Sequence, residues 1–148
     1  MANSLTNEGQ WLALGATSGS SVSGSKGATN TAGLILAADR IALFSNATTP
    51  AKDGTGFTAV GGGSGGDAKT ISDANWTGSL QGSAPNQNAQ VVLANQTWTA
   101  TATISNIAGT YIYINATGEE LGWWERSSAV TLLTSDQITA DSLTVRLT

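Results

Sequence analysis

The sequence predicts an all-β protein, an antiparallel β-sandwich of the jelly-roll-like kind, with a short N-terminal helix or arm. From residue 90 onward, short runs of alternating apolar and polar residues follow one another, separated by turn residues. This pattern is typical of antiparallel sandwiches and related all-β folds. A long helical period of apolar residues is found nowhere in the chain. We therefore expect an arm over residues 1–33 and one sandwich domain over residues 34–148.

Length and composition exclude several classes of function. The chain of 148 residues has no cysteine and no histidine, and charged residues make up 11% of it, against roughly 25% in ordinary soluble domains. These absences exclude thiol chemistry and the commonest general base. The net charge of −4 argues against nucleic-acid binding. An apolar stretch of the roughly 18–20 residues that span a bilayer is missing, so no membrane partner is expected.

The N-terminal region divides into two parts. Residues 5–14 form either a short helix, capped by Ser4 or Thr6, or an extended arm. Trp11 and Leu12 are its candidate contact residues. Residues 15–33 are rich in Ser, Gly and Thr and almost devoid of large apolar groups, which indicates a flexible or extended surface segment. We expect the first residues to dock at a distance, on a neighbouring subunit if the protein is an oligomer.

The middle of the chain carries a weaker strand signal. The predicted elements are strands over 40–45, 57–60 and 67–72, a loop over 46–56, a glycine run over 61–66, and an irregular stretch over 73–89 anchored by Trp76 and Leu80.

The strand signal is strongest in the C-terminal part. The predicted strands are 90–94, 98–104, 110–115, 121–126, 129–133 and 142–147.

The hairpin over 110–126 concentrates the aromatic residues. It holds both tyrosines, Tyr111 and Tyr113, and the tandem Trp123 and Trp124. Neighbouring residues of a strand point to opposite faces, so the two tryptophans cannot lie in one layer. Three explanations stay open, namely packing within the domain, a subunit interface and stacking on a sugar. The interface candidates are Trp11, Leu12, Tyr111, Tyr113, Trp123 and Trp124.

Three patterns that could carry chemistry are weak. The run Gly61–Gly66 fits a dinucleotide motif by composition, but no helix is expected after it. Asp53–Gly56 with Asp67 offers few oxygen ligands for calcium. Glu119, Glu120 and Glu125 flank a turn, where adjacent carboxylates point into water rather than into a glycosidase cleft. No catalytic residue, cofactor site or metal site is assigned, and we do not expect an enzyme.

The order of segments resembles small structural proteins of tailed-bacteriophage virions, some of which are tail-fibre or minor structural proteins and some capsid decoration proteins. The resemblance covers most of the chain, although no single motif is specific. Its departures are residues 15–33 and 63–66, which look like insertions, Glu119 in place of a glycine, and Ser135 before Asp136 where the family prefers Gly-Asp. The matching segments are 5–9, 41–45, 59–63 with 67–69, 113–121, 130–132 and 142–147.

The resemblance implies a non-enzymatic virion protein that is made in the host cytoplasm. Within the virion, we expect a capsid decoration (cement) protein that bridges capsid subunits and stabilises the head. Its partners would be the major capsid protein or other virion subunits, together with copies of itself, for which a trimer is favoured. The alternative is a tail or fibre module that binds host surface glycans through exposed aromatic residues.

Overall fold

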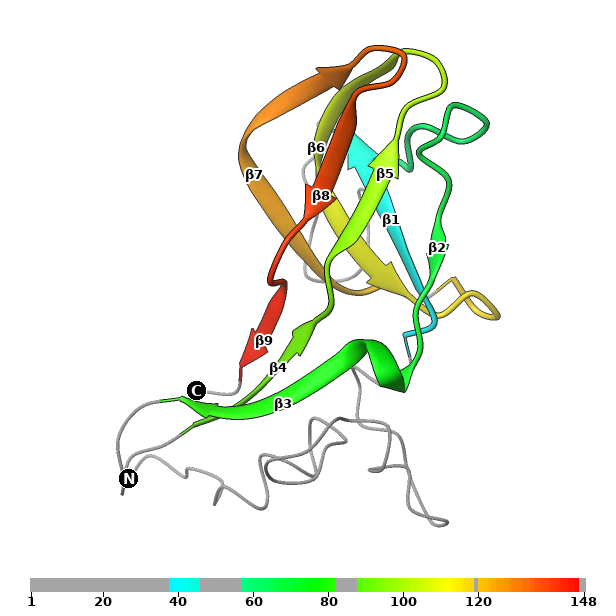
Figure 1. The fold of residues 1–148 in the computed structure, drawn as a ribbon. Helices are drawn as coiled ribbons and strands as arrows, with labels where there is room; N and C mark the ends of the chain where they lie inside the picture. Colours follow the sequence, from blue (N-terminus) through cyan, green and yellow to red (C-terminus); the bar gives the residue numbers. More distant parts are fainter. Residues whose placement is uncertain (1–37, 46–56, 82–87, 119, 147–148) are drawn as a thin grey trace. The chain divides into compact units, whose positions relative to one another are not determined.

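The computed structural model describes residues 38–45, 57–81, 88–118 and 120–146. The predicted N-terminal helix or arm and the loop over 46–56 lie outside these residues. The described chain is all-β with antiparallel sheets, apart from one 3-10 turn, η2 (Asp73–Asn75) (Figure 1). The predicted all-β, sandwich-like fold is thus confirmed, whereas the strand order does not establish a jelly roll.

The described chain separates into two compact units. The aromatic unit comprises the described parts of 38–71 and 95–140, and the Trp76 unit comprises the described parts of 72–94 and 141–146. Each unit has its own sheets, so the predicted domain over 34–148 contributes described strands to both.

The aromatic unit is built on a four-stranded sheet in the order β2-β1-β6-β7, with β5 and β8 paired in a second sheet. Trp98 on β5 pairs directly with Ile138 on β8, and both side chains are buried. The Trp98 indole N–H donates to the Asp67 carbonyl at 2.9 Å, which ties β5 to the segment before β2. The strands are β1 (Arg40–Ser45), β2 (Lys69–Thr70), β5 (Gln96–Thr99), β6 (Ile104–Tyr113), β7 (Glu120–Leu132) and β8 (Gln137–Ala140).

The four-stranded sheet is buried on both faces of β1. Ile41 and Leu43 point to one face together with Ile112, which pairs with Ile41. Ala42 and Phe44 point to the other face. A strand buried on both sides has a continuous apolar run in its sequence, which is why the sequence of 40–45 predicts this strand correctly.

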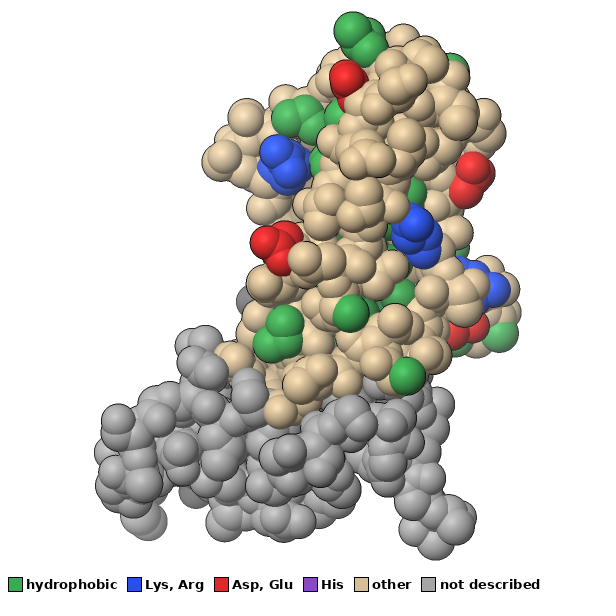
Figure 2. All heavy atoms as spheres, in the orientation of Figure 1, with side chains coloured by type: hydrophobic (Ala, Val, Ile, Leu, Met, Phe, Trp, Pro, Cys, Tyr) green, Lys and Arg blue, Asp and Glu red, His purple; other side chains and the backbone are tan. Residues whose placement is uncertain are grey.

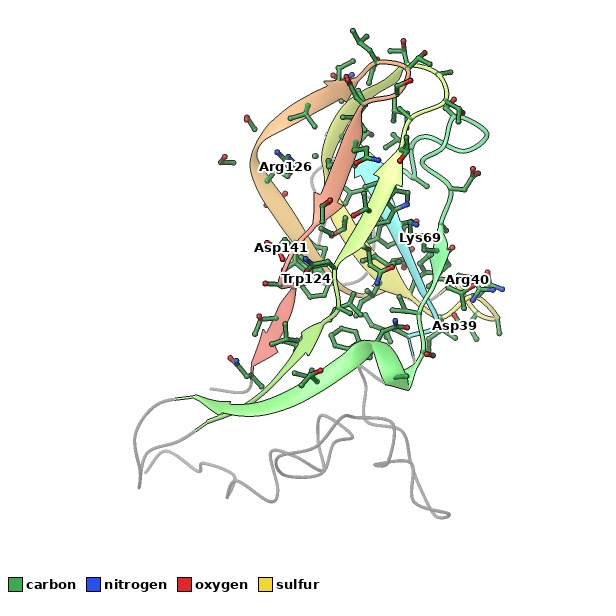
Figure 3. All side chains as sticks on the ribbon, viewed as in Figure 1. Asp39, Arg40, Lys69, Trp124, Arg126 and Asp141 are labelled. Carbon is green, nitrogen blue, oxygen red and sulfur yellow. The ribbon has the colours of Figure 1, made fainter. Side chains whose placement is uncertain are left out.

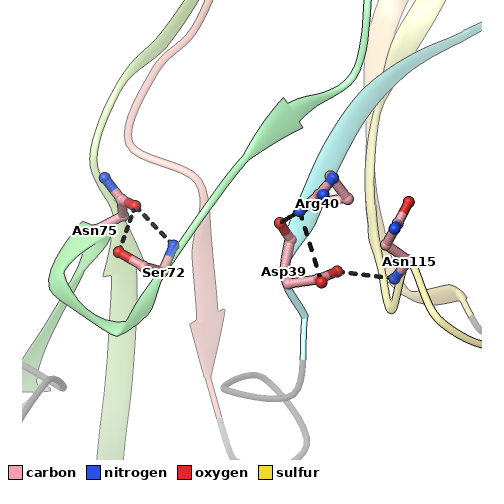
Figure 4. Close-up of polar contacts among 5 residues, drawn as sticks. All are labelled: Asp39, Arg40, Ser72, Asn75 and Asn115. Atoms are coloured by element: carbon pink, nitrogen blue, oxygen red, sulfur yellow. Dashed lines mark hydrogen bonds and ion pairs between the residues drawn. The ribbon is translucent and has the colours of Figure 1, made fainter.

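The Trp76 unit contains β3 (Trp76–Gln81), β4 (Asn88–Leu93) and β9 (Thr144–Arg146) in the order β3-β4-β9. Trp76 pairs with Leu93, and both side chains are buried. The Ser72 backbone N–H donates to the Asn75 side-chain oxygen at 2.8 Å, a contact back to a residue three positions earlier that closes the turn before β3 (Figure 4).

Five expectations about elements are wrong. Residues 57–60 are not a strand, because only Ala59 forms an isolated bridge there, with Phe44. The described part of 73–89 is not irregular, because β3 pairs along its whole length with β4. Residues 98–104 are not one strand, since the Thr101 N–H donates to the Ser64 carbonyl and leaves the ladder. Residues 121–126 and 129–132 belong to the single strand β7, which ends one residue before the predicted strand 129–133 does, and β8 is not among the predicted strands. A strand that is stabilised by pairing with a distant segment need not show alternating apolar and polar residues in its own sequence.

Candidate interaction surface

One face of the four-stranded sheet carries a row of aromatic side chains, here called the aromatic face. The register places Ala42, Tyr111 and Trp123 side by side across β1, β6 and β7. Directly paired residues of an antiparallel sheet lie on the same face. The aromatic face consists of Phe44, Phe57, Tyr111, Tyr113 and Trp123.

The rings of this face form a continuous stack with edge contacts at its sides. Phe57 stacks on Tyr111 with 4.9 Å between ring centroids, and Tyr111 stacks on Tyr113 at 5.3 Å. The interplanar angle is 24° in both contacts. Two rings contact Phe57 edge-on. The distance between ring centroids is 5.7 Å for Trp123 and 5.5 Å for Phe44. Such contacts contribute about 0.5–1.5 kcal/mol each beyond the burial of area.

The aromatic face has a buried centre and a more accessible rim. Phe44 is 0% and Tyr111 is 7% exposed. Phe57, Tyr113 and Trp123 are only partly buried and pack against that centre. The centre fixes the positions of the rim rings, so the accessible ring surface is held in place before anything binds to it.

Burial also changes the acidity of the central tyrosine. The pKa of Tyr111 is raised above its usual 10.0, first because burial removes water from the phenolate and then because Tyr113 and Glu120 would repel it. Tyr111 therefore stays neutral at physiological pH and acts as a ring and a hydroxyl rather than as a charge. Glu120 pairs directly with Tyr113, which places it on the same face of the sheet as the aromatic rings.

Trp124 faces the other way. It pairs with Thr110, whereas Trp123 pairs with Tyr111, so the two indoles leave β7 on opposite sides (Figure 3 labels Trp124). Both side chains are partly buried. The tandem tryptophans thus belong to two different layers, as the alternation in the sequence predicts.

The tip of the β6–β7 hairpin is held by Asp39, which precedes β1. The Asn115 backbone N–H donates to the Asp39 carboxylate at 2.8 Å, and the Asp39 N–H donates to the Tyr113 carbonyl at 3.2 Å (Figure 4). Arg40 lies 3.6 Å from the same carboxylate. At the tip itself Gly118 has φ 76°, the left-handed conformation that favours glycine. These contacts position Tyr113 at the rim of the aromatic face.

Gly109 allows the strands behind the aromatic rings to approach closely. A Cβ atom there would lie 2.1 Å from the Trp124 carbonyl oxygen and 2.8 Å from the Phe44 ring. Gly109 pairs with Phe44 on one side and with Glu125 on the other. A side chain at this position would displace the ring at the centre of the cluster.

The glycine run over 61–66 is a packed turn. The Gly66 N–H donates to the Gly61 carbonyl at 2.9 Å, and Gly65, with φ 82°, would place a Cβ 2.1 Å from the Thr99 carbonyl oxygen. The segment continues into β2 rather than a helix. The glycines serve close backbone contact, the interpretation favoured over nucleotide binding.

The described residues also bear on the candidate metal site and the acidic residues singled out in the sequence. Among the described residues, no group of three or more acidic side chains is placed to hold a metal ion. The Asp67 carboxylate accepts the Gly63 N–H at 2.9 Å, which is turn chemistry. The segment Asp53–Gly56 and Glu119 lie outside the described residues, as do Trp11 and Leu12 among the interface candidates.

Sequence reasoning missed two members of the aromatic face. The sequence pattern predicts that Phe44 and Phe57 lie in strands, but it does not predict that their rings join the cluster of Tyr111, Tyr113 and Trp123. Phe57 lies beside β1, where the Ser45 N–H donates to the Thr58 carbonyl at 2.9 Å. A pairing signal between residues 44 and 59, which form an isolated bridge, would have revealed it. A single sequence contains no such signal.

The surface around these elements is sparsely charged. On the side of the molecule drawn in Figure 2, acidic and basic side chains are few and are scattered among neutral polar atoms, apart from the adjacent Asp39 and Arg40. Leu133 is the one large apolar side chain of the described residues that is mostly exposed, at 60%. It lies in the turn between β7 and β8, away from the residues of the aromatic face in sequence.

Comparisons with known proteins find no family model, no curated protein and no solved structure that matches this chain. The resemblance to virion proteins therefore stays a prediction. No helix of the described residues is long and apolar enough to cross a membrane.

Proposed function

We propose that this protein is a non-enzymatic structural subunit of a bacteriophage virion, and that its role is capsid decoration. The observation that supports the proposal is the aromatic face, whose buried centre holds a rim of partly accessible rings in fixed positions. Preorganised aromatic side chains are typical of protein contact surfaces. The low charge of the chain, 11% of residues, reduces the desolvation cost of such a contact.

The proposed mechanism is bridging. The rim residues Tyr113 and Trp123 would pack against the major capsid protein or another virion subunit. Copies repeated over a symmetric lattice would then act together, since each added contact is an intramolecular event with a high effective concentration. Many modest contacts would raise the cost of opening the shell without any chemical step.

The test uses particles that lack the protein. Heat-induced release of DNA is measured before and after adding back wild-type protein or the Trp123→Ala variant. We expect wild-type protein to raise the release temperature and Trp123→Ala to have little effect. Leu133→Ser is the matched control, because it removes an exposed apolar side chain outside the aromatic face. Unchanged particle stability, or antibody label found only on the tail, would contradict the proposal.

A second candidate is a tail or fibre module that binds host glycans. The partly accessible rings of Tyr113 and Trp123 favour it, since flat ring surfaces suit the apolar face of a sugar. The Glu120 carboxylate near Tyr111 would supply a hydrogen-bond acceptor. Here Trp123→Ala should abolish adsorption to cells while particles still assemble. Glycan arrays and cell-binding assays without any signal would rule this candidate out.

A further inference from the structure

We propose that the aromatic face recognises a basic segment of its partner, in which arginine side chains pack on the accessible rings and pair with two carboxylates beside them. The rings are those of Tyr113 and Trp123, and the carboxylates are those of Glu120 and Glu125. The inference rests on the proposed function, because it names the chemistry that a virion subunit would present to this face. It narrows the partner surface from an apolar one to a positively charged one.

The register of β7 places both carboxylates on the aromatic face. Glu120 pairs directly with Tyr113, and directly paired residues share a face. Leu121 is an extra residue in the ladder with β6, which is why Glu120 and Trp123 share a face although they are three positions apart. Glu125 follows Trp123 by two positions, so alternation along the strand puts it on this face as well. Trp123 therefore lies between two acidic side chains along β7.

The spacing brings an acid and two rings together. Opposite side chains of an antiparallel pair have Cβ atoms about 5 Å apart, and neighbours on one face of a strand are about 7 Å apart. Glu120 is thus close to Tyr113 and to Trp123, and all three are partly accessible, whereas Glu125 is exposed. A side chain with an apolar stem and a positive end fits this arrangement, because the stem covers ring surface and the end meets a carboxylate.

The basic residues of the aromatic unit do not neutralise these carboxylates. Among those that the structure describes, only Arg40 lies on the aromatic face. Its guanidinium donates to the Asp39 carbonyl at 2.8 Å and lies 3.6 Å from the Asp39 carboxylate (Figure 4). Lys69 pairs with Ile41 and so lies on the opposite face, where alternation along β7 also places Arg126. A positive charge for the two glutamates must therefore come from the partner.

Arginine suits this face better than lysine does. Its planar guanidinium is weakly hydrated, stacks on aromatic rings and can donate two parallel N–H groups to one carboxylate. Tryptophan, tyrosine and arginine are also the residues that most often dominate the energy of protein contacts. A neutral sugar would use the same rings, but glutamine would serve it as an acceptor as well as glutamate does. The requirement for negative charge therefore separates a basic partner from a glycan.

The first test measures the binding of a labelled hexa-arginine peptide to the purified full-length protein by fluorescence anisotropy. Glu120→Gln should raise the Kd about tenfold, because this glutamate is partly buried. Glu125→Gln should raise it about threefold, since an exposed ion pair contributes less. Added salt should weaken the binding of wild type more than that of either variant.

The matched control is Asp141→Asn, which removes the same charge from an exposed residue of the Trp76 unit. It should leave the affinity for hexa-arginine unchanged. Equal weakening in all three variants would mean that the net charge of −4 attracts the peptide without a site, and it would overturn the proposal. Absence of binding by wild type would overturn it too. Glutamine has nearly the shape of glutamate, and the unfolding temperature of each variant checks that it folds.

The second test repeats the comparison on particles that lack the protein, and it separates this inference from the proposed function. We expect wild type and Asp141→Asn to occupy the head, and Glu120→Gln to need a higher protein concentration for the same occupancy. Equal occupancy by both glutamine variants at every salt concentration would overturn the basic partner and leave the capsid role intact. Hexa-arginine binding that depends on Glu120, with no binding of wild type to particles, would support the basic ligand and contradict the proposed function.

Discussion

The two faces of the β2-β1-β6-β7 sheet use the same strands for different purposes. On one face Ile41, Leu43 and Ile112 are each 0% exposed. On the other face Phe44 and Tyr111 are buried, but Tyr113 and Trp123 keep part of their ring surface accessible. The aliphatic face is closed packing that serves stability. The aromatic face adds to stability at its centre and leaves its rim partly accessible.

The largest expected effect is on the aliphatic face. Ile112→Ala should lower the free energy of unfolding by about 2–5 kcal/mol, because it removes a fully buried side chain and leaves a cavity. Trp123→Ala should cost less, since its indole is only partly buried. Chemical denaturation of both variants checks the order. If Trp123→Ala lost as much free energy of unfolding as Ile112→Ala, or more, the two faces would not differ in the way described.

The next effect compares two glycines on opposite faces. Gly109→Ala should destabilise the protein by about 1–3 kcal/mol, because the new methyl group overlaps the Trp124 carbonyl and the Phe44 ring. Gly122→Ala is the matched control, since its Cβ would meet Ile112 at 3.9 Å, an ordinary contact. Thermal unfolding should show a clear drop for the first variant alone. A similar drop for both would point to the glycine backbone rather than to crowding behind the aromatic rings.

The aromatic centre should also make stability depend on alkaline pH. The pKa of Tyr111 is higher in the folded chain than its usual 10.0, because of burial and then of Tyr113 and Glu120. Its contribution to stability is therefore complete below pH 10.0 and is lost as the pH rises through the folded-state pKa. The unfolding temperature should fall above that pH, and it should fall less in Tyr111→Phe. If the unfolding temperature of Tyr111→Phe fell with pH in the same way as that of wild type, Tyr111 would not be the group responsible.

The smallest expected effect is at the hairpin tip. Asp39→Ala removes the acceptor for the Asn115 N–H and should cost about 0.5–1.5 kcal/mol. Asp39→Asn keeps an acceptor oxygen but loses the charge beside Arg40, so it should cost less. Hydrogen exchange at the Asn115 amide separates the two variants. We expect faster exchange in Asp39→Ala alone. Unchanged exchange in both variants would show that Asp39 does not help to position Tyr113.

The sequence predicts the elements whose pattern is local. The strand over 40–45 contains a continuous apolar run at 41–44, and the hairpin over 110–126 shows clear alternation with a glycine at its turn. Both are strands or turns in the structure. The opposite orientation of Trp123 and Trp124 follows from the same alternation. These features need no knowledge of which strands become neighbours.

The rest depends on contacts between distant segments. Strand β3 has little alternation of its own and is defined by its pairing with β4. Strand β8 follows a turn in which Ser135 has φ 76°, and the local pattern predicts no strand after that turn. Phe57 joins the aromatic face only because residues 58–60 run beside β1. Such pairings carry no signature in one sequence.

The most direct test of the proposed function is the binding of purified protein to particles that lack it. Occupancy is measured by electron microscopy for wild type, Trp123→Ala and Leu133→Ser. We predict full occupancy on the head for wild type and Leu133→Ser, and little or none for Trp123→Ala with its fold intact. Wild-type occupancy by Trp123→Ala would contradict the claim that the aromatic face is the contact surface.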